Sequence, residues 1–292
     1  MLIQEIQVLR VSVMILIVAS HGSIIGGPKF DAGGDFGVAF FFVLSGLVAW
    51  LSQHQAIEDG SFRVKPYLKK RICKILWLHI ATWILANLLD HNVSALLASL
   101  PALFLVQSWV PQSDIYFGGN PVSWFLSDLM LAWILLPWLF KLVKKSWTMP
   151  CLLCLYVGWM IFLPEREINA WLYVWPPVRL LDFLLGMKLG QWITAHTILE
   201  ERNGKLGSFN LILAVISIIG ITAGLVWYEE MNAHLRNAAY FWPFILMLLY
   251  ASCRGVKFMT VGYQTVWNKI APWTMHIYLT HVLILRVITH YL

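Results

Sequence analysis

Apolar runs separated by short polar segments extend over almost the whole chain. They lie near residues 8–26, 36–51, 75–89, 123–140, 149–163, 177–194, 209–228, 239–253 and 271–290. A helix needs about 20 residues to cross a hydrocarbon core about 30 Å thick. The pattern predicts an all-α fold, a polytopic transmembrane helix bundle of about 9–10 spans that forms a single membrane domain over residues 1–292.

One further apolar segment, residues 93–110, is harder to assign to a span. Pro101 lies inside it and interrupts the helical hydrogen-bond pattern. The segment is therefore either a kinked tenth span or a re-entrant or interfacial segment.

Composition supports a membrane protein and excludes several other classes. Hydrophobic residues make up 59% and charged residues 12% of the chain, whereas soluble domains carry about 25% charged residues. The net charge of +6 is explained by basic cytoplasmic loops and does not indicate nucleic-acid binding. The four cysteines give no disulfide framework, and Cys151 and Cys154 have no His or second cysteine pair nearby, so we expect no metal site.

Basic residues gather in alternate loops and thereby predict the orientation. They are Arg63, Lys65, Lys69, Lys70, Arg71, Lys74, Lys141, Lys144, Lys145, Lys188, Arg202, Lys205, Arg254, Lys257 and Lys269. Cytoplasmic loops are enriched in Lys and Arg, so these loops and the N-terminus are predicted to be cytoplasmic. The assignment is consistent if residues 93–110 do not cross the membrane; if they do cross, another span must be assigned wrongly.

Two ionisable residues in the first apolar run are the leading functional candidates. Arg10 and His21 are almost three helical turns apart, so they share a face and are separated by roughly 16 Å along the axis. His21 would lie towards the outer side, where its imidazole can accept and return a proton as a general base. The alternatives are a hydrogen-bonded structural histidine and an arginine that extends to the cytoplasmic surface.

Two further sites accompany this pair. Asp35 begins the second span on the same side as His21, where it could orient the imidazole or cap the helix. Arg71 and Lys74 lie one turn apart at the cytoplasmic start of the third span. They could bind a phosphate group or simply anchor the span.

Several motifs together carry a resemblance to a known family. They are Gln7 to Arg10 with His21, Gly37 to Gly46, Tyr67 to Ile75, Trp124 to Ser127, Arg179 to Gly186, and Ile277 to His281. In order and spacing the chain resembles the bacterial integral-membrane acyltransferase 3 family, which O-acylates glycans. Arg71 matches the first residue of the family's Arg-x-x-Arg pattern, and Lys74 replaces the second.

The resemblance implies an enzyme with His21 as the catalytic residue, and the position of Asp35 on the same side suggests that it assists His21. The donor would be acetyl-CoA or another acyl-CoA, used as a substrate with no permanently bound cofactor, and Arg10, Arg71 and Lys74 would bind it. The acceptor would be a sugar hydroxyl of a surface or secreted polysaccharide or of its lipid-linked precursor. Trp124, Asp128 and Arg179 are expected to bind this acceptor, with Arg179 and Asp182 close enough for an i,i+3 ion pair.

The expected location is the bacterial inner membrane, in contact with lipid, and the oligomeric state stays open. Two other hypotheses fit the buried ionisable residues. One is a transporter or flippase of lipid-linked sugars, although no internal repeat supports it. The other is a non-catalytic subunit of an envelope assembly complex.

Overall fold

The computed structural model describes residues 4–200, 206–258 and 261–291, and all regular secondary structure in these residues is helical. The longer helices are α1 (Gln4–Ser20), α2 (Asp31–Glu58), α3 (Val64–Asp90), α4 (Val93–Leu103), α6 (Trp124–Lys144), α7 (Thr148–Phe162), α8 (Pro176–Glu200), α9 (Leu206–Val226), α11 (Trp242–Cys253), α12 (Val261–Ile270) and α13 (Thr274–Tyr291). Shorter elements connect them: η1 (Gly22–Ile25), η2 (Gln107–Trp109), α5 (Ser113–Tyr116), η3 (Glu165–Glu167), η4 (Asn169–Tyr173), α10 (Ala233–Arg236) and η5 (Ala271–Trp273).

The predicted all-α membrane bundle is confirmed. Each predicted apolar run overlaps one of the longer helices. In the described part of the chain, four helical stretches are long and apolar enough to cross a membrane: α2, α3, α6 and Gly207–Val226 of α9. α4, α7 and α11 are apolar but shorter. The chain is therefore a multi-pass membrane protein.

The uncertain segment 93–110 does not form a complete span. Its helix, α4, has 11 residues, which at about 1.5 Å per residue reach only about half-way across a hydrocarbon core. The backbone turns immediately afterwards, since Leu105 adopts a positive φ of 56°. A re-entrant or interfacial segment fits this geometry, and the orientation predicted from charge requires the same. Arg202 and Lys205, two of the residues used for that prediction, lie outside the described residues.

The first predicted span ends earlier than expected. The apolar run reaches residue 26, but α1 ends at Ser20 and His21 begins a turn that leads into η1. Gly26 closes this turn with a φ of 80°, a conformation that costs other residues energy. His21 is therefore at the end of a helix rather than inside one.

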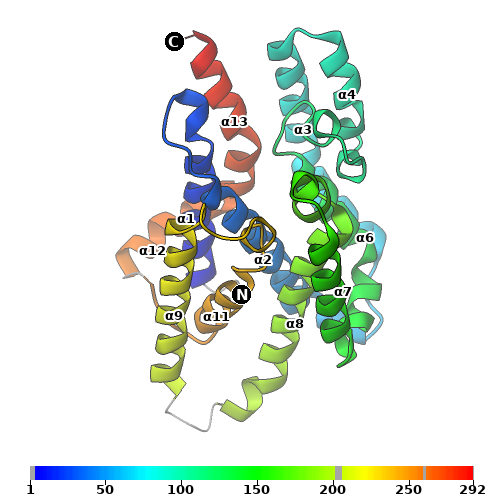
Figure 1. Cartoon of the computed structure of the whole chain (residues 1–292). Helices are drawn as coiled ribbons and strands as arrows, with labels where there is room; N and C mark the ends of the chain where they lie inside the picture. Colours follow the sequence, from blue (N-terminus) through cyan, green and yellow to red (C-terminus); the bar gives the residue numbers. More distant parts are fainter. Residues whose placement is uncertain (1–3, 201–205, 259–260, 292) are drawn as a thin grey trace.

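α2 lies in the centre of the bundle between α1 and α8 (Figure 1). Its crossing with α8 is close because both helices carry glycine there. A Cβ atom on Gly46 would lie 1.8 Å from the Phe183 carbonyl oxygen, and one on Gly186 would lie 1.8 Å from that of Val43. Larger residues at these two positions would force the helices apart.

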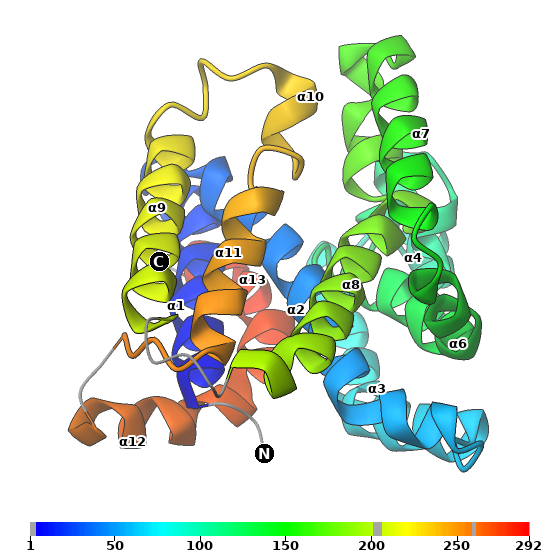
Figure 2. The same cartoon turned by 90° about the horizontal axis from the view of Figure 1, so that it is seen from below.

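The two ends of the bundle carry different elements. α12 lies at one end and α10 at the opposite end (Figure 2). The core between them is apolar and aromatic, with Phe36, Phe40, Phe42 and Phe183 almost fully buried. Two cavities follow each other along one face of α2, the first lined by Gly34 and Asp35 and the second by Val38, Phe41 and Ser45.

Candidate active site

His21 is held in one defined orientation by its own helix. Its Nδ1 atom lies 2.9 Å from the carbonyl oxygen of Ile17. A carbonyl only accepts hydrogen bonds, so neutral His21 carries its proton on Nδ1. The Ser20 hydroxyl, 3.2 Å from the same Nδ1, donates to the Ile17 carbonyl at 2.7 Å. Nε2 is therefore the basic nitrogen, as a general base requires.

His281, in α13, packs directly against His21. The two ring centroids are 4.8 Å apart and the rings are nearly perpendicular. Nδ1 of His281 lies 2.7 Å from the Tyr278 carbonyl oxygen and must donate to it. Its Nε2 is left as an acceptor, 3.3 Å from Nδ1 of His21. His281 thus provides a second acceptor for the His21 Nδ1–H.

A cavity of about 510 Å³ begins at His21, and we call it the His21 cavity. Its walls come from α1, η1, α2, the η3–η4 segment and the α9–α10 region. The polar lining residues are Ser20, His21, Ser23, Asp31, Asp35, Glu165, Asn169, Tyr173, Tyr228, Arg236 and Asn237. His21 and Asp35, predicted to act together, therefore face one cavity.

The partner of Asp35 differs from the expectation. Asp35 accepts a hydrogen bond from the Tyr228 hydroxyl, and among the described residues no hydrogen bond joins it to His21. Burial and the neighbouring Asp35 carboxyl raise the pKa of the Tyr228 hydroxyl, so this group stays protonated and donates. The Ile17 carbonyl and His281 orient the imidazole instead.

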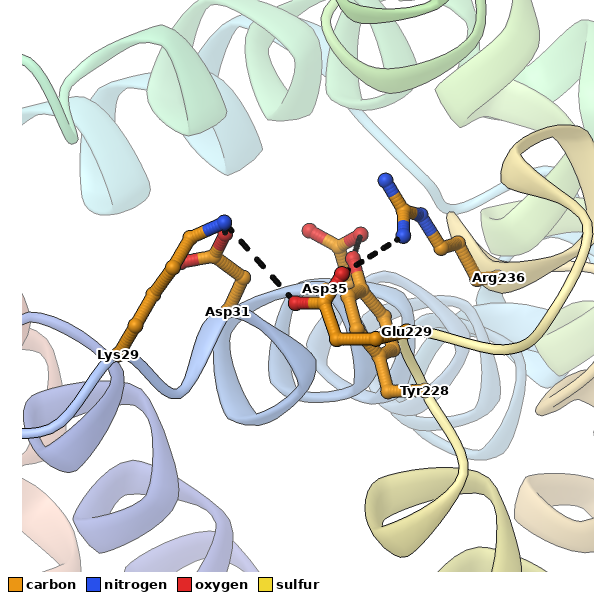
Figure 3. A network of polar contacts seen from close by, with 6 residues as sticks. All are labelled: Lys29, Asp31, Asp35, Tyr228, Glu229 and Arg236. Carbon is orange, nitrogen blue, oxygen red and sulfur yellow. Dashed lines mark hydrogen bonds and ion pairs between the residues drawn. The ribbon is translucent and has the colours of Figure 1, made fainter.

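A network of charged residues connects two loops beside the His21 cavity (Figure 3). Asp31 and Arg236 of this network line the cavity. Lys29 lies 2.9 Å from Asp31 and 3.9 Å from Glu229. Glu229 also pairs with Arg236 at 3.2 Å. The loop before α2 and the loop after α9 are thereby joined on one side of the cavity.

A second cavity, of about 530 Å³, lies along α1 from Arg10 to Ile17, and we call it the Arg10 cavity. It brings together all three predicted donor-binding residues, Arg10, Arg71 and Lys74, and adds Lys70. Its remaining walls are largely apolar and aromatic. A basic end joined to an apolar wall suits a ligand with phosphates and an uncharged arm.

Arg10 faces the bundle interior and not lipid. Its guanidinium donates to Gln7 Oε1 at 3.1 Å and to Thr274 Oγ1 at 3.0 Å. Thr274 is the first residue of α13, so Arg10 connects the first helix to the last. The Arg71 guanidinium lies over the rings of Tyr67, at 4.6 Å, and Trp133, at 5.3 Å, which orients its planar group.

Only a thin partition separates the two cavities. On α1, Ile17 lines the Arg10 cavity and Ser20 the His21 cavity. On α2, Val38 lines the Arg10 cavity and Asp35 lines the His21 cavity. Three helical residues span about 4.5 Å. On both helices, the residues that line the two cavities are therefore within about one helical turn of each other, next to His21.

The three predicted acceptor-binding residues line neither of these cavities. Arg179 is 1% exposed and pairs with Asp182 at 2.8 Å, which confirms the expected i,i+3 ion pair. Asp182 also accepts from the Trp242 indole. Trp124 packs between Phe42 and Tyr173, and Asp128 is buried. All three side chains therefore lie in the core beside the cavities, and their role in acceptor binding stays a prediction.

Sequence reasoning missed Tyr228 and Arg236 as cavity residues. Tyr228 follows Asp35 by 193 positions, and neither residue stands in a recognisable motif. His281 did carry a signal, because an ionisable residue in an apolar span is a functional candidate.

These features define the class: a multi-pass membrane helix bundle in which a polar cavity begins at one histidine and a second cavity, with a basic end and largely apolar walls, comes close to it. The family defined by the acyltransferase domain matches residues 3–292. The chain therefore belongs to this family and is an acyl-transferring membrane enzyme. The resemblance seen in the sequence is confirmed.

A relative of this chain is also named as an acyltransferase. Acyltransferase MdmB of Streptomyces mycarofaciens is 25% identical over 281 residues, which cover 87% of this chain and 68% of the relative. No solved structure matches the chain.

Proposed function

We propose that this enzyme transfers an acyl group, most simply acetyl, from acyl-CoA to a sugar hydroxyl. The acceptor is a surface or secreted polysaccharide or its lipid-linked precursor, and the enzyme works in the bacterial inner membrane with its N-terminus in the cytoplasm. The observation that carries the proposal is the approach of two chemically different cavities to one oriented histidine, His21.

The Arg10 cavity is the proposed donor site. Arg71, Lys74 and Lys70 offer positive charge for the phosphates of acyl-CoA. The uncharged arm would follow the apolar wall past Arg10 towards Ile17. That path would bring the thioester to the partition beside His21.

The His21 cavity is the proposed acceptor site. The reaction there needs only acyl-CoA and the sugar hydroxyl as reactants. Nε2 of His21 takes the proton as the sugar oxygen attacks the thioester carbonyl. A C–O bond forms, the C–S bond breaks, and the imidazolium returns the proton to the sulfur. The products are the acyl ester and free CoA.

His281 and Asp35 have separate tasks in this scheme. His281 and the Ile17 carbonyl hold the His21 Nδ1–H, so that Nε2 faces the substrate. They also stabilise the imidazolium that forms during the reaction. Asp35, bonded to Tyr228, is placed to accept a hydrogen bond from a sugar hydroxyl.

The test is transfer of a labelled acyl group by the purified protein. Radiolabelled acetyl-CoA and glycan extracted from the producing cell are supplied, and the product is analysed by mass spectrometry. We expect a mass increase of one acetyl group on the glycan, which His21→Ala abolishes. Normal transfer by a folded His21→Ala protein would contradict the mechanism.

A further inference from the structure

A third cavity, of about 570 Å³, lies beside the His21 cavity, and we call it the Asp90 cavity. Its walls come from the end of α3, from α4, from the α5 region and from α13. Its polar lining residues are Asp90, Asn92, Ser94, Asp114 and Arg286. The mechanism above uses none of them.

The Asp90 cavity and the His21 cavity share two lining residues, Ile24 and Phe117. On α13, Val282 of the Asp90 cavity follows His281 directly. Because they share these walls, the two cavities lie side by side, and we treat them together as one groove. A molecule that occupied both would pass Phe117.

The Asp90 cavity has a fixed polar wall. Arg286 of α13 pairs with Asp90, the last residue of α3, and both side chains are only partly exposed, at 29% and 26%. The pair holds the two helices at the cavity and leaves further oxygen and N–H positions for a ligand. Both cavities fall within the range of about 300–1,000 Å³ typical of small-molecule sites.

Charge restricts the ligand that this groove accepts. The two cavities are lined by five carboxyl side chains, of Asp31, Asp35, Asp90, Asp114 and Glu165, and by only two arginines, Arg236 and Arg286. An anionic glycan would be repelled by this excess of carboxylates. The Arg10 cavity, with four basic residues, has the opposite character.

We infer that the Asp90 cavity is a second acceptor subsite, and that the acceptor is an uncharged oligosaccharide of at least two sugar units. One unit presents its hydroxyl to His21, and the next occupies the Asp90 cavity with Phe117 between them. The inference rests on the proposed function, because it assumes a glycan acceptor.

A blocking substitution on α4 tests the subsite without altering its charged residues. Ala95 lines the cavity and is partly buried, so Ala95→Trp fills it. Leu97→Trp on the same helix is the matched control, because Leu97 is 61% exposed and lines none of the three cavities. The acceptors are fragments of the glycan, separated into one-unit, two-unit and longer pieces.

With acetyl-CoA as donor, we expect Ala95→Trp to lower kcat/KM for fragments of two or more units by about tenfold, the effect of losing one to two hydrogen bonds. The one-unit fragment should react as with the unaltered enzyme, and Leu97→Trp should change neither. If Ala95→Trp lowered kcat/KM equally for short and long fragments, or did not lower it for long fragments, the second subsite would be overturned.

A second comparison tests the charge preference. A two-unit acceptor whose second sugar is a uronic acid should react more slowly than its neutral counterpart, and Asp114→Asn should narrow the difference. Equal rates would overturn the preference. If the unaltered enzyme acylates no fragment of any length, the proposed function itself fails, which is distinguishable from failure of the subsite.

Discussion

The Arg10 cavity and the His21 cavity are similar in size but opposite in chemistry. The first combines four basic side chains with apolar walls, and the second is polar with an excess of carboxyl groups. The phosphates of an acyl-CoA donor would be attracted to the basic cavity and repelled by the carboxyl groups of the other. Under the proposed function, this difference in charge would keep a phosphate-bearing donor apart from a polyhydroxylated acceptor, and the two would meet beside His21.

The largest effect is expected from removing the residue at which the two cavities meet. His21→Ala should lower kcat by about 10²–10⁴, the usual contribution of a general base. Acyl-CoA binding, measured by calorimetry, should stay normal because the Arg10 cavity is unchanged. Loss of donor binding together with activity would indicate that the variant is misfolded or that His21 has a structural role.

Removing positive charge from the Arg10 cavity should affect only the donor. Arg71→Ala should raise the KM for acetyl-CoA by about 20-fold, because a charge-assisted hydrogen bond contributes about 1.5–3 kcal/mol. The KM for the glycan should not change. Lys69→Ala, an exposed neighbour that lines none of the cavities described, is the control. A rise in the glycan KM instead would reverse the assignment of the two cavities.

Loss of His281 should weaken the reaction without weakening either binding step. His281→Ala should lower kcat by about tenfold, the effect of about 1.4 kcal/mol of lost hydrogen bonding in the transition state. Both KM values should stay within the error of the unaltered enzyme. His281→Gln, whose amide oxygen can accept from the His21 Nδ1–H, should recover part of the rate. Equal kcat values for His281→Ala and His281→Gln would mean that His281 has only a packing role.

The smallest effect is expected at the rim of the His21 cavity. Glu229 lies between Lys29 and Arg236, and its side chain is 64% exposed. Exposed ion pairs contribute about 0–1 kcal/mol, so Glu229→Gln should change the glycan KM by about twofold. Glu230→Gln is the matched control. A large change in the KM for acetyl-CoA would contradict the separation of the two sites.

The sequence was sufficient for the bundle and singled out several residues that line the two cavities, for identifiable reasons. Apolar runs are long and direct signals, so the helices could be assigned without tertiary information. Arg10 and His21 were recognisable because charge is costly in an apolar segment, and Arg71 because it lies one helical turn from Lys74. The sequence left open whether Arg10 faces the bundle interior or extends to the cytoplasmic surface, and its hydrogen bond to Thr274 places it in the interior.

What the sequence did not provide depends on contacts between distant helices. Asp35 was a correct candidate for the cavity, but its partner Tyr228 comes from the loop after α9. Arg179 was charged and in a span, yet its charge is neutralised within the same helix by Asp182. The early end of α1 required the conformation of Gly26, which an apolar run does not reveal.

The most direct test of the central claim is the sidedness of the reaction. The enzyme is reconstituted in sealed vesicles with one orientation, verified by protease access to an N-terminal tag, and membrane-impermeant acetyl-CoA and glycan are supplied to chosen sides. Acylated glycan should form when acetyl-CoA is on the Arg10 side and the glycan on the His21 side. Product formed with both substrates confined to the His21 side would contradict donor entry through the Arg10 cavity.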